Sequence, residues 1–133
     1  MNLGNQHKHV PAGASQHSTA GPYSPVLEID AKKIVVISGQ VAIDDDGNVQ
    51  GSTIEEQTRY TIQNCERQLA TGGCSLEDVF KVNVFMINLD EWDRFNAVYE
   101  EMIPPPRPVR TTVGTRLLAG FQIEIEMWAV KRT

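Results

Sequence analysis

The chain has 133 residues, of which 41% are hydrophobic and 22% are charged, an ordinary composition for one globular domain. Seventeen acidic residues against twelve basic ones leave a formal net charge of −5, which argues against a nucleic-acid partner. No apolar run reaches the roughly 18 residues of a membrane span, and the polar start lacks a signal-peptide core. We therefore expect a cytoplasmic protein with reduced cysteines and no membrane partner.

The beginning of the chain is polar and shows no apolar periodicity. Residues 1–16 therefore predict a flexible N-terminal tail, and residues 17–133 a single domain. The three histidines, His7, His9 and His17, all fall in or beside this tail. Histidines without acidic or thiol neighbours are a weak signal for a metal, so we expect no metal site.

The first half of the domain predicts two strands followed by a helix. The β-branched run Ile34–Ile37 is typical of a buried strand. A helix is expected from Ile54 to Leu69, because apolar residues recur there at spacings of three and four. Ser52-Thr53 opens this helix, with Glu55 and Glu56 placed for a capping box, and Gly72-Gly73 stops it.

The second half predicts a strand, a helix and two strands. Val79–Ile87 is rich in valine and phenylalanine, which favours a strand. Trp92–Met102 carries an apolar stripe at helical spacing, and the proline run that starts at Pro104 ends this helix. Two further strands are expected at Arg110–Leu117 and Phe121–Val130, with a turn between them.

This order of elements predicts an α+β fold, a mixed sheet with both helices on one face. Along the last strand, the residues expected to face the helices are Ile123, Ile125, Met127 and Ala129. Those expected on the other face are Gln122, Glu124, Glu126, Trp128 and Val130. Because Trp128 and Val130 suit a partly buried interface better than solvent, we predict an oligomer.

Two groups of residues offer chemistry. Arg110 begins a strand directly after a proline-rich turn, and a guanidinium held this way can grip a carboxylate through two bonds. Glu124 and Glu126 lie about 7 Å apart on one strand face, so they could divide water activation and structural pairing between them. The alternative in both cases is an ordinary solvated side chain.

Six short motifs occur in the order and spacing of the Rid/YjgF family, which the chain resembles over roughly residues 18–131. The motifs are Gly21-Pro22-Tyr23-Ser24, Ser38-Gly39-Gln40, Gln57-Thr58 with Asn64, Phe95-Asn96-x-x-Tyr99, Pro108-Val109-Arg110 and Ile123-Glu124-Ile125-Glu126. Each motif alone is weak, but six in the same order are specific.

The resemblance implies a chorismate-mutase-like α+β fold assembled as a homotrimer, with sites in the clefts between subunits. It also implies hydrolysis of reactive enamine and imine acids, such as 2-aminoacrylate, to 2-keto acids and ammonia. The better-known members of the family use no metal and no organic cofactor, so we expect none here.

The resemblance also assigns roles to individual residues. Arg110 corresponds to the arginine that binds the substrate carboxylate, and Glu124 to the acid that positions the attacking water. Gly39 corresponds to the backbone group at the imine end of the substrate. Tyr23 corresponds to an aromatic wall of the pocket, and Asn96 to a polar position near it.

Two positions near Arg110 complete the expected site. Thr112 stands where some members have a cysteine and lines the pocket. Arg107 is a second arginine nearby, but Arg110 keeps the Pro-x-Arg pattern and directly begins the strand. Three alternatives remain open: a small-molecule-binding or regulatory trimer without catalysis, an endoribonuclease or translation inhibitor, and a deaminase specialised for another pathway.

Overall fold

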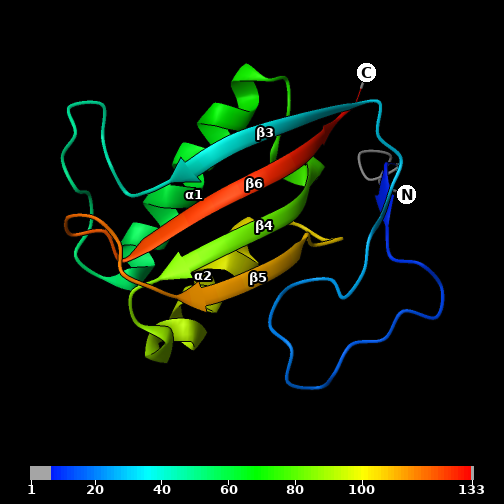
Figure 1. Cartoon of the computed structure of the whole chain (residues 1–133), viewed down its shortest axis with the longest axis horizontal. Helices are drawn as coiled ribbons and strands as arrows, with labels where there is room; N and C mark the ends of the chain where they lie inside the picture. The colour runs from blue at the N-terminus through cyan, green and yellow to red at the C-terminus, as the bar shows by residue number, and fades with distance from the viewer. Residues whose placement is uncertain (1–6, 133) are drawn as a thin grey trace.

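The computed structural model describes residues 7–132, in which a four-stranded mixed sheet carries two α-helices on one face (Figure 1). The strand order is β3-β6-β4-β5, with β4 and β5 parallel and the other neighbours antiparallel. The elements are β3 (Lys33–Gln40), α1 (Ile54–Thr71), β4 (Val79–Met86), α2 (Trp92–Met102), β5 (Val109–Gly114) and β6 (Ile123–Lys131). This confirms the predicted α+β fold.

Helix α1 begins at the predicted capping box. The Thr53 hydroxyl accepts a hydrogen bond from the Glu56 amide at 3.1 Å, and the Glu56 carboxylate accepts one from the Thr53 amide at 3.2 Å. The helix ends before Gly72, whose amide donates to the Leu69 carbonyl. The predicted apolar face is buried against the sheet, which fixes the helix on one side.

Within residues 7–132, no helix combines the length and apolar character needed to cross a membrane.

Strand β6 lies inside the sheet and alternates as predicted. Ile123, Ile125, Met127 and Ala129 are fully buried beneath the helices. The strand begins later than predicted and β5 ends earlier, because residues 115–122 form a turn in which Ala119 has a φ of 50°.

The sheet surface that bears no helix is called the open face. Val130 lies on it but is only 1% exposed within the chain, so its use as evidence for an interface was wrong. The exposed apolar residues of this face lie instead on β3, where Ile34 and Val36 are 54% and 56% exposed. They pair with Val130 and Trp128 of β6. An apolar patch therefore remains on the open face, at a different strand from the one expected.

The N-terminal segment makes a contact that the sequence analysis missed. Strand β1 (Lys8–His9) pairs with β2 (Glu28–Ile29), and Lys8 is 2% exposed. The Lys8 ammonium donates to the Val79 carbonyl at 2.5 Å. The prediction of a flexible, solvated tail is therefore wrong for Lys8. A lysine can bury its apolar stem when its ammonium has an acceptor.

Docking of Lys8 makes the stability of the fold depend on pH. Burial lowers the pKa of Lys8 to about 8, against the opposing attraction of Asp78. The folded chain therefore releases this proton at a lower pH than the unfolded chain, and stability should increase as the pH rises from 8 towards 10. Melting temperatures of the wild type and Lys8→Met across this range should diverge in favour of the wild type. A constant difference between the two would show that Lys8 does not carry the effect.

Candidate functional site

Arg110 lies on the helix-covered face of the sheet, at the edge strand β5. It pairs with Val82 of β4, which is fully buried beneath the helices. Three aromatic rings surround its guanidinium carbon, at centroid distances of 4.7 Å for Tyr99 and 5.1 Å for both Phe95 and Tyr23. We call these three rings the aromatic cage. It places the predicted aromatic wall, Tyr23, directly against the predicted clamp.

The guanidinium in this cage has no anionic partner within residues 7–132. Its Nε and Nη1 atoms are enclosed and make no hydrogen bond there. Burial lowers the pKa of Arg110, and the nearby hydroxyls of Tyr99 and Tyr23 oppose the shift. Because an arginine in a protein stays protonated, the site holds a buried positive charge with unused donors. Such a charge favours an anion, and a carboxylate fits its planar fork.

Other polar atoms without partners line the same end of α2 and β5. They are the Asn96 Oδ1, the Tyr99 hydroxyl and the Thr112 Oγ1. Burial raises the pKa of Tyr99, so its hydroxyl stays protonated. Thr112 lies two positions after Arg110 on β5 and shares its face, and Asn96 follows Phe95 of the cage on α2. We call Tyr23, Phe95, Asn96, Tyr99, Arg110 and Thr112 together the Arg110 half-site.

Tyr23 reaches the half-site from a loop that packs closely on α2 and the start of β5. The Ser24 amide donates to the Pro108 carbonyl at 3.2 Å, and its hydroxyl donates to the Arg107 carbonyl. A Cβ on Gly21 would lie 3.0 Å from the Trp92 ring, so only glycine allows this approach without displacement. The Gly21-Pro22-Tyr23-Ser24 motif thus holds Tyr23 in place as one wall of the cage.

Gly39 and Glu124 form a second group, on the open face. The register between β3 and β6 shifts beside Gly39, between Ile37 and Gln40. A Cβ at Gly39 would lie 2.3 Å from the Glu124 Oε2, so the carboxylate rests over the glycine backbone. We call this pair the Glu124 half-site.

The two carboxylates of β6 have different surroundings. The Asn83 amide donates to the Glu126 Oε1 at 3.2 Å. Glu124 faces Phe85 across the strands, and no hydrogen-bond donor holds it within residues 7–132. The predicted structural pairing therefore belongs to Glu126, and the Glu124 carboxylate keeps its acceptor capacity.

The structure separates the predicted site residues into two half-sites on opposite faces of one sheet. Arg110 shares its face with buried Val82, whereas Glu124 shares the open face with Phe85. Side chains on opposite faces of a sheet cannot close on one small molecule. Within one copy, Arg110 and Glu124 are therefore not brought together.

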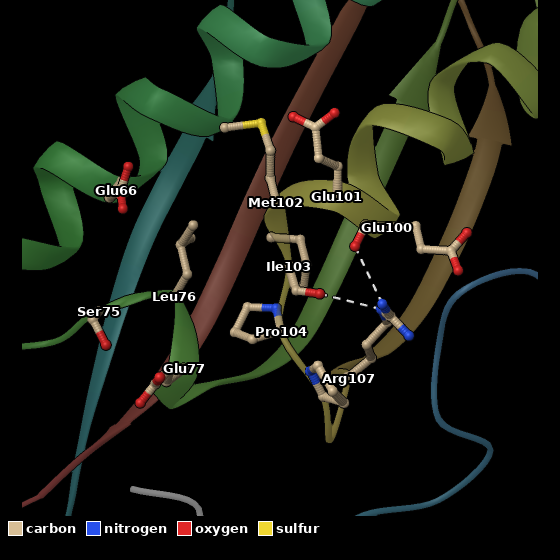
Figure 2. Close-up of a pocket in the computed structure, with 11 residues that line it drawn as sticks. Glu66, Ser75, Leu76, Glu77, Glu100, Glu101, Met102, Ile103, Pro104 and Arg107 are labelled. Atoms are coloured by element: carbon tan, nitrogen blue, oxygen red, sulfur yellow. Dashed lines mark hydrogen bonds between the residues drawn. The ribbon is translucent and has the colours of Figure 1, made fainter.

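Arg107 has a structural contact that the sequence analysis did not foresee. Its Nε donates to the Ile103 carbonyl and its Nη2 to the Glu100 carbonyl, both at 3.1 Å (Figure 2). These carbonyls belong to the end of α2, which lacks intrahelical donors. Arg107 thus caps α2 and does not join the cage.

Arg107 lines two cavities in the described part of the chain: one includes the predicted residue Asn96 together with Gly21 and Pro22, and the other contains none of the predicted site residues. The second cavity has a volume of about 510 Å³ and lies between α1, the end of α2 and the loop before β4 (Figure 2). Its charged lining is mainly acidic, with Glu66, Glu77, Glu100 and Glu101 beside Arg107. Two N–H donors of Arg107 in this lining are used by the Ile103 and Glu100 carbonyls.

The cysteines belong to neither half-site, although Cys65 lies near enough to Tyr99 to act on its pKa. Cys65 and Cys74 are buried and not bonded to each other, and burial raises the pKa of Cys65 to about 12. A thiol with this pKa is a poor nucleophile at neutral pH. Among residues 7–132, His, Cys, Asp and Glu form no group of three or more that could hold a metal ion.

Sequence reasoning missed two members of the cage. Phe95 and Tyr99 were recognised within a motif, but only Asn96 received a role. A signal was present, because residues four apart on a helix share one face, and two aromatic rings there can meet a cation.

Comparisons with known proteins identify the family to which the chain is similar. A family model described as Endoribonuclease L-PSP matches residues 14–131. The chain is 40% identical over 126 residues to protein mmf2, mitochondrial, of Schizosaccharomyces pombe, covering 92% of this chain and 98% of that protein. The predicted cytoplasmic location stays a prediction, because this relative is named mitochondrial.

Solved structures give the same picture. The crystal structure of RidA from an Antarctic Psychrobacter matches with a TM-score of 0.70 and 27% identity, covering 77% of this chain and 84% of that one. The structure of E. coli TdcF with bound serine matches with a TM-score of 0.69 and 27% identity, covering 78% and 85%.

The capping contact of Arg107 predicts an effect on stability. Arg107→Ala leaves two carbonyls at the end of α2 without a donor, which should cost roughly 1 kcal/mol and lower the melting temperature by a few degrees. Arg116→Ala serves as the control, because Arg116 is exposed in the turn after β5. Thermal unfolding followed by circular dichroism measures both variants. Equal melting temperatures for the two would contradict the capping role.

Proposed function

Because the chain belongs to the YjgF/RidA family, whose model is described as Endoribonuclease L-PSP, we propose that it hydrolyses 2-enamine and 2-imine acids to 2-keto acids and ammonia. The observation that carries the proposal is the buried guanidinium of Arg110, which has unused donors and no anion. The substrates of such a reaction carry a carboxylate next to the reacting carbon, and this carboxylate is the missing partner. The serine bound to the relative TdcF also bears a carboxylate beside a carbon that carries nitrogen.

The chemistry needs little from the protein beyond orientation. An enamine acid such as 2-aminoacrylate takes a proton on its terminal carbon and becomes an imine. Water then adds to the C=N carbon, the nitrogen takes up a proton, and the intermediate collapses with loss of ammonia. One water is consumed, and 2-aminoacrylate yields pyruvate. Arg110 fixes the carboxylate, so the imine carbon meets the water in one geometry.

Glu124 is the group proposed to orient that water and accept its proton. Its carboxylate has no donor that holds it within residues 7–132, so its lone pairs are available. It rests over the Gly39 backbone, in the space that a side chain at that position would otherwise fill. Gly39 is accordingly proposed to border the imine end of the substrate.

The two half-sites are proposed to meet across an interface between copies of the chain. They lie on opposite faces of the sheet, and a second copy can bring its Glu124 to the Arg110 of the first. The open face supports this arrangement, since exposed Ile34 and Val36 lie beside Trp128 on the same surface. A closed ring of three copies would give three equivalent sites, and we propose this homotrimer.

An endoribonuclease is the second candidate, because the family model carries that description. The net charge of −5 disfavours a polyanionic substrate, and all three histidines lie at or before residue 17. Cleavage of RNA that is lost in Arg110→Ala would support this candidate. A regulatory trimer is separated from the enzyme by turnover alone, since both would bind the same carboxylate.

Replacement of Arg110 tests the carboxylate clamp. Arg110→Ala should lower kcat/KM for keto-acid release from freshly generated imines about a hundredfold or more, because roughly 2–4 kcal/mol of charge-assisted binding is lost. Arg110→Lys should rescue poorly, since an ammonium lacks the planar fork. Arg107→Ala should keep near-normal turnover despite its lower melting temperature. Normal keto-acid release by Arg110→Ala would end the clamp proposal.

Mixing two inactive variants tests whether the site is shared between copies. Arg110→Ala and Glu124→Gln are each expected to be nearly inactive alone. After unfolding and refolding together in equal amounts, about a quarter of the sites should combine an intact Arg110 with an intact Glu124 from a neighbour, given random assembly into closed rings. Keto-acid release should then return to about a quarter of the wild-type rate. If the refolded mixture releases keto acid no faster than the two variants do separately, the two residues do not share one site between copies.

A further inference from the structure

Arg110 is held in a different way from the three arginines within residues 7–132 that pair with carboxylates. Arg59 pairs with Glu101, Arg94 with Glu55 and Glu91, and Arg132 with Glu77 and Asp78. These carboxylates raise the pKa of their arginines. The pKa of Arg110 is instead lowered by burial, and rings take the place of carboxylates around it.

This difference has a consequence for binding. A carboxylate would fix the guanidinium firmly, but it would also occupy its N–H donors and neutralise its charge. Aromatic faces attract a cation through the ring quadrupole and leave the N–H donors in the guanidinium plane unused. The enclosed, unpaired Nε and Nη1 of Arg110 fit this description.

Tyr99 is the ring best placed to hold Arg110. It lies nearest to the guanidinium carbon, at 4.7 Å, and is fully buried. Phe95 supports it one turn earlier on α2, with ring centroids 5.5 Å apart and planes inclined by 46°. Because α2 packs against the sheet, both rings are fixed by the core rather than by the loop that carries Tyr23.

We infer that Tyr99, supported by Phe95, is a positioning residue for Arg110: its ring sets the orientation of the guanidinium while leaving the N–H donors free for a carboxylate. The inference rests on the proposed clamp function of Arg110 and extends it to a residue that need not touch the substrate. The ring carries the effect, so phenylalanine should replace Tyr99, whereas an aliphatic side chain of similar bulk should not.

The test compares Tyr99→Phe and Tyr99→Leu in the full chain, with pyruvate as a carboxylate probe that needs no turnover. Tyr99→Leu should weaken pyruvate binding and raise KM roughly ten- to thirtyfold, with a smaller change in kcat, because a desolvated cation–ring contact is lost. Tyr99→Phe should stay within about threefold of the wild type. Leu69→Ala is the control for general destabilisation, because Leu69 is equally buried in α1 and has no contact with the cage.

A double-mutant cycle separates positioning from a purely structural role. In the Arg110→Ala background, Tyr99→Leu should cause no further loss of pyruvate affinity, because the residue acts only through Arg110. If Tyr99→Leu does not fold, Phe95→Leu is measured in the same cycle. The positioning role would be overturned if Tyr99→Leu had the same KM as Leu69→Ala. It would also be overturned if Tyr99→Leu lowered pyruvate affinity as much in the Arg110→Ala background as in the wild type. Either result would leave the clamp proposal intact. A wild type that neither binds pyruvate nor releases keto acid would remove the proposed function itself.

Discussion

The constraint on which the rest of the site depends is a buried positive charge without a counter-charge. Moving a guanidinium out of water is costly. Arg59, Arg94 and Arg132 pair with carboxylates and remain partly exposed, so they avoid much of that cost. At Arg110 the offset comes from Tyr23, Phe95 and Tyr99, and it is incomplete because two nitrogens keep no partner. A bound carboxylate would supply the remainder. The proposed affinity for an anion therefore depends on the packing of α2 against the sheet, which holds the rings around Arg110.

The sheet separates the Arg110 half-site from the Glu124 half-site. Strand alternation alone places Arg110 beneath α2 and Glu124 on the open face, and neither side chain can change faces without a shift of register. The register shifts beside Gly39, and the Glu124 carboxylate fills the space that a Cβ at Gly39 would occupy. The proposed site would be completed only by bringing together unlike faces of two copies. The exposed Ile34 and Val36 on the open face would give the proposed association an apolar driving force.

The sequence predicted those features that depend on neighbours along the chain. The capping box at Thr53 and the alternation of Ile123, Ile125 and Met127 are local patterns, and the structure confirms them. It could not predict contacts between distant segments. Lys8 binds the Val79 carbonyl across 71 positions, and Val130 is buried although its neighbours on the open face are not. For the site, motif spacing identified Arg110 and Glu124, but their separation by the sheet required the strand pairing.

The two carboxylates of β6 show how a cross-strand neighbour can decide the chemistry of a residue. Glu124 and Glu126 are identical in type, lie two positions apart and share one face. Asn83 on β4 donates to Glu126, whereas the residue facing Glu124 is Phe85, which has no side-chain donor. One oxygen of the Glu126 carboxylate is therefore already engaged, whereas Glu124 has no such partner within residues 7–132 and keeps both oxygens available to accept from a water. The Glu124 carboxylate also lies over Gly39, where no side chain stands between it and the strand backbone.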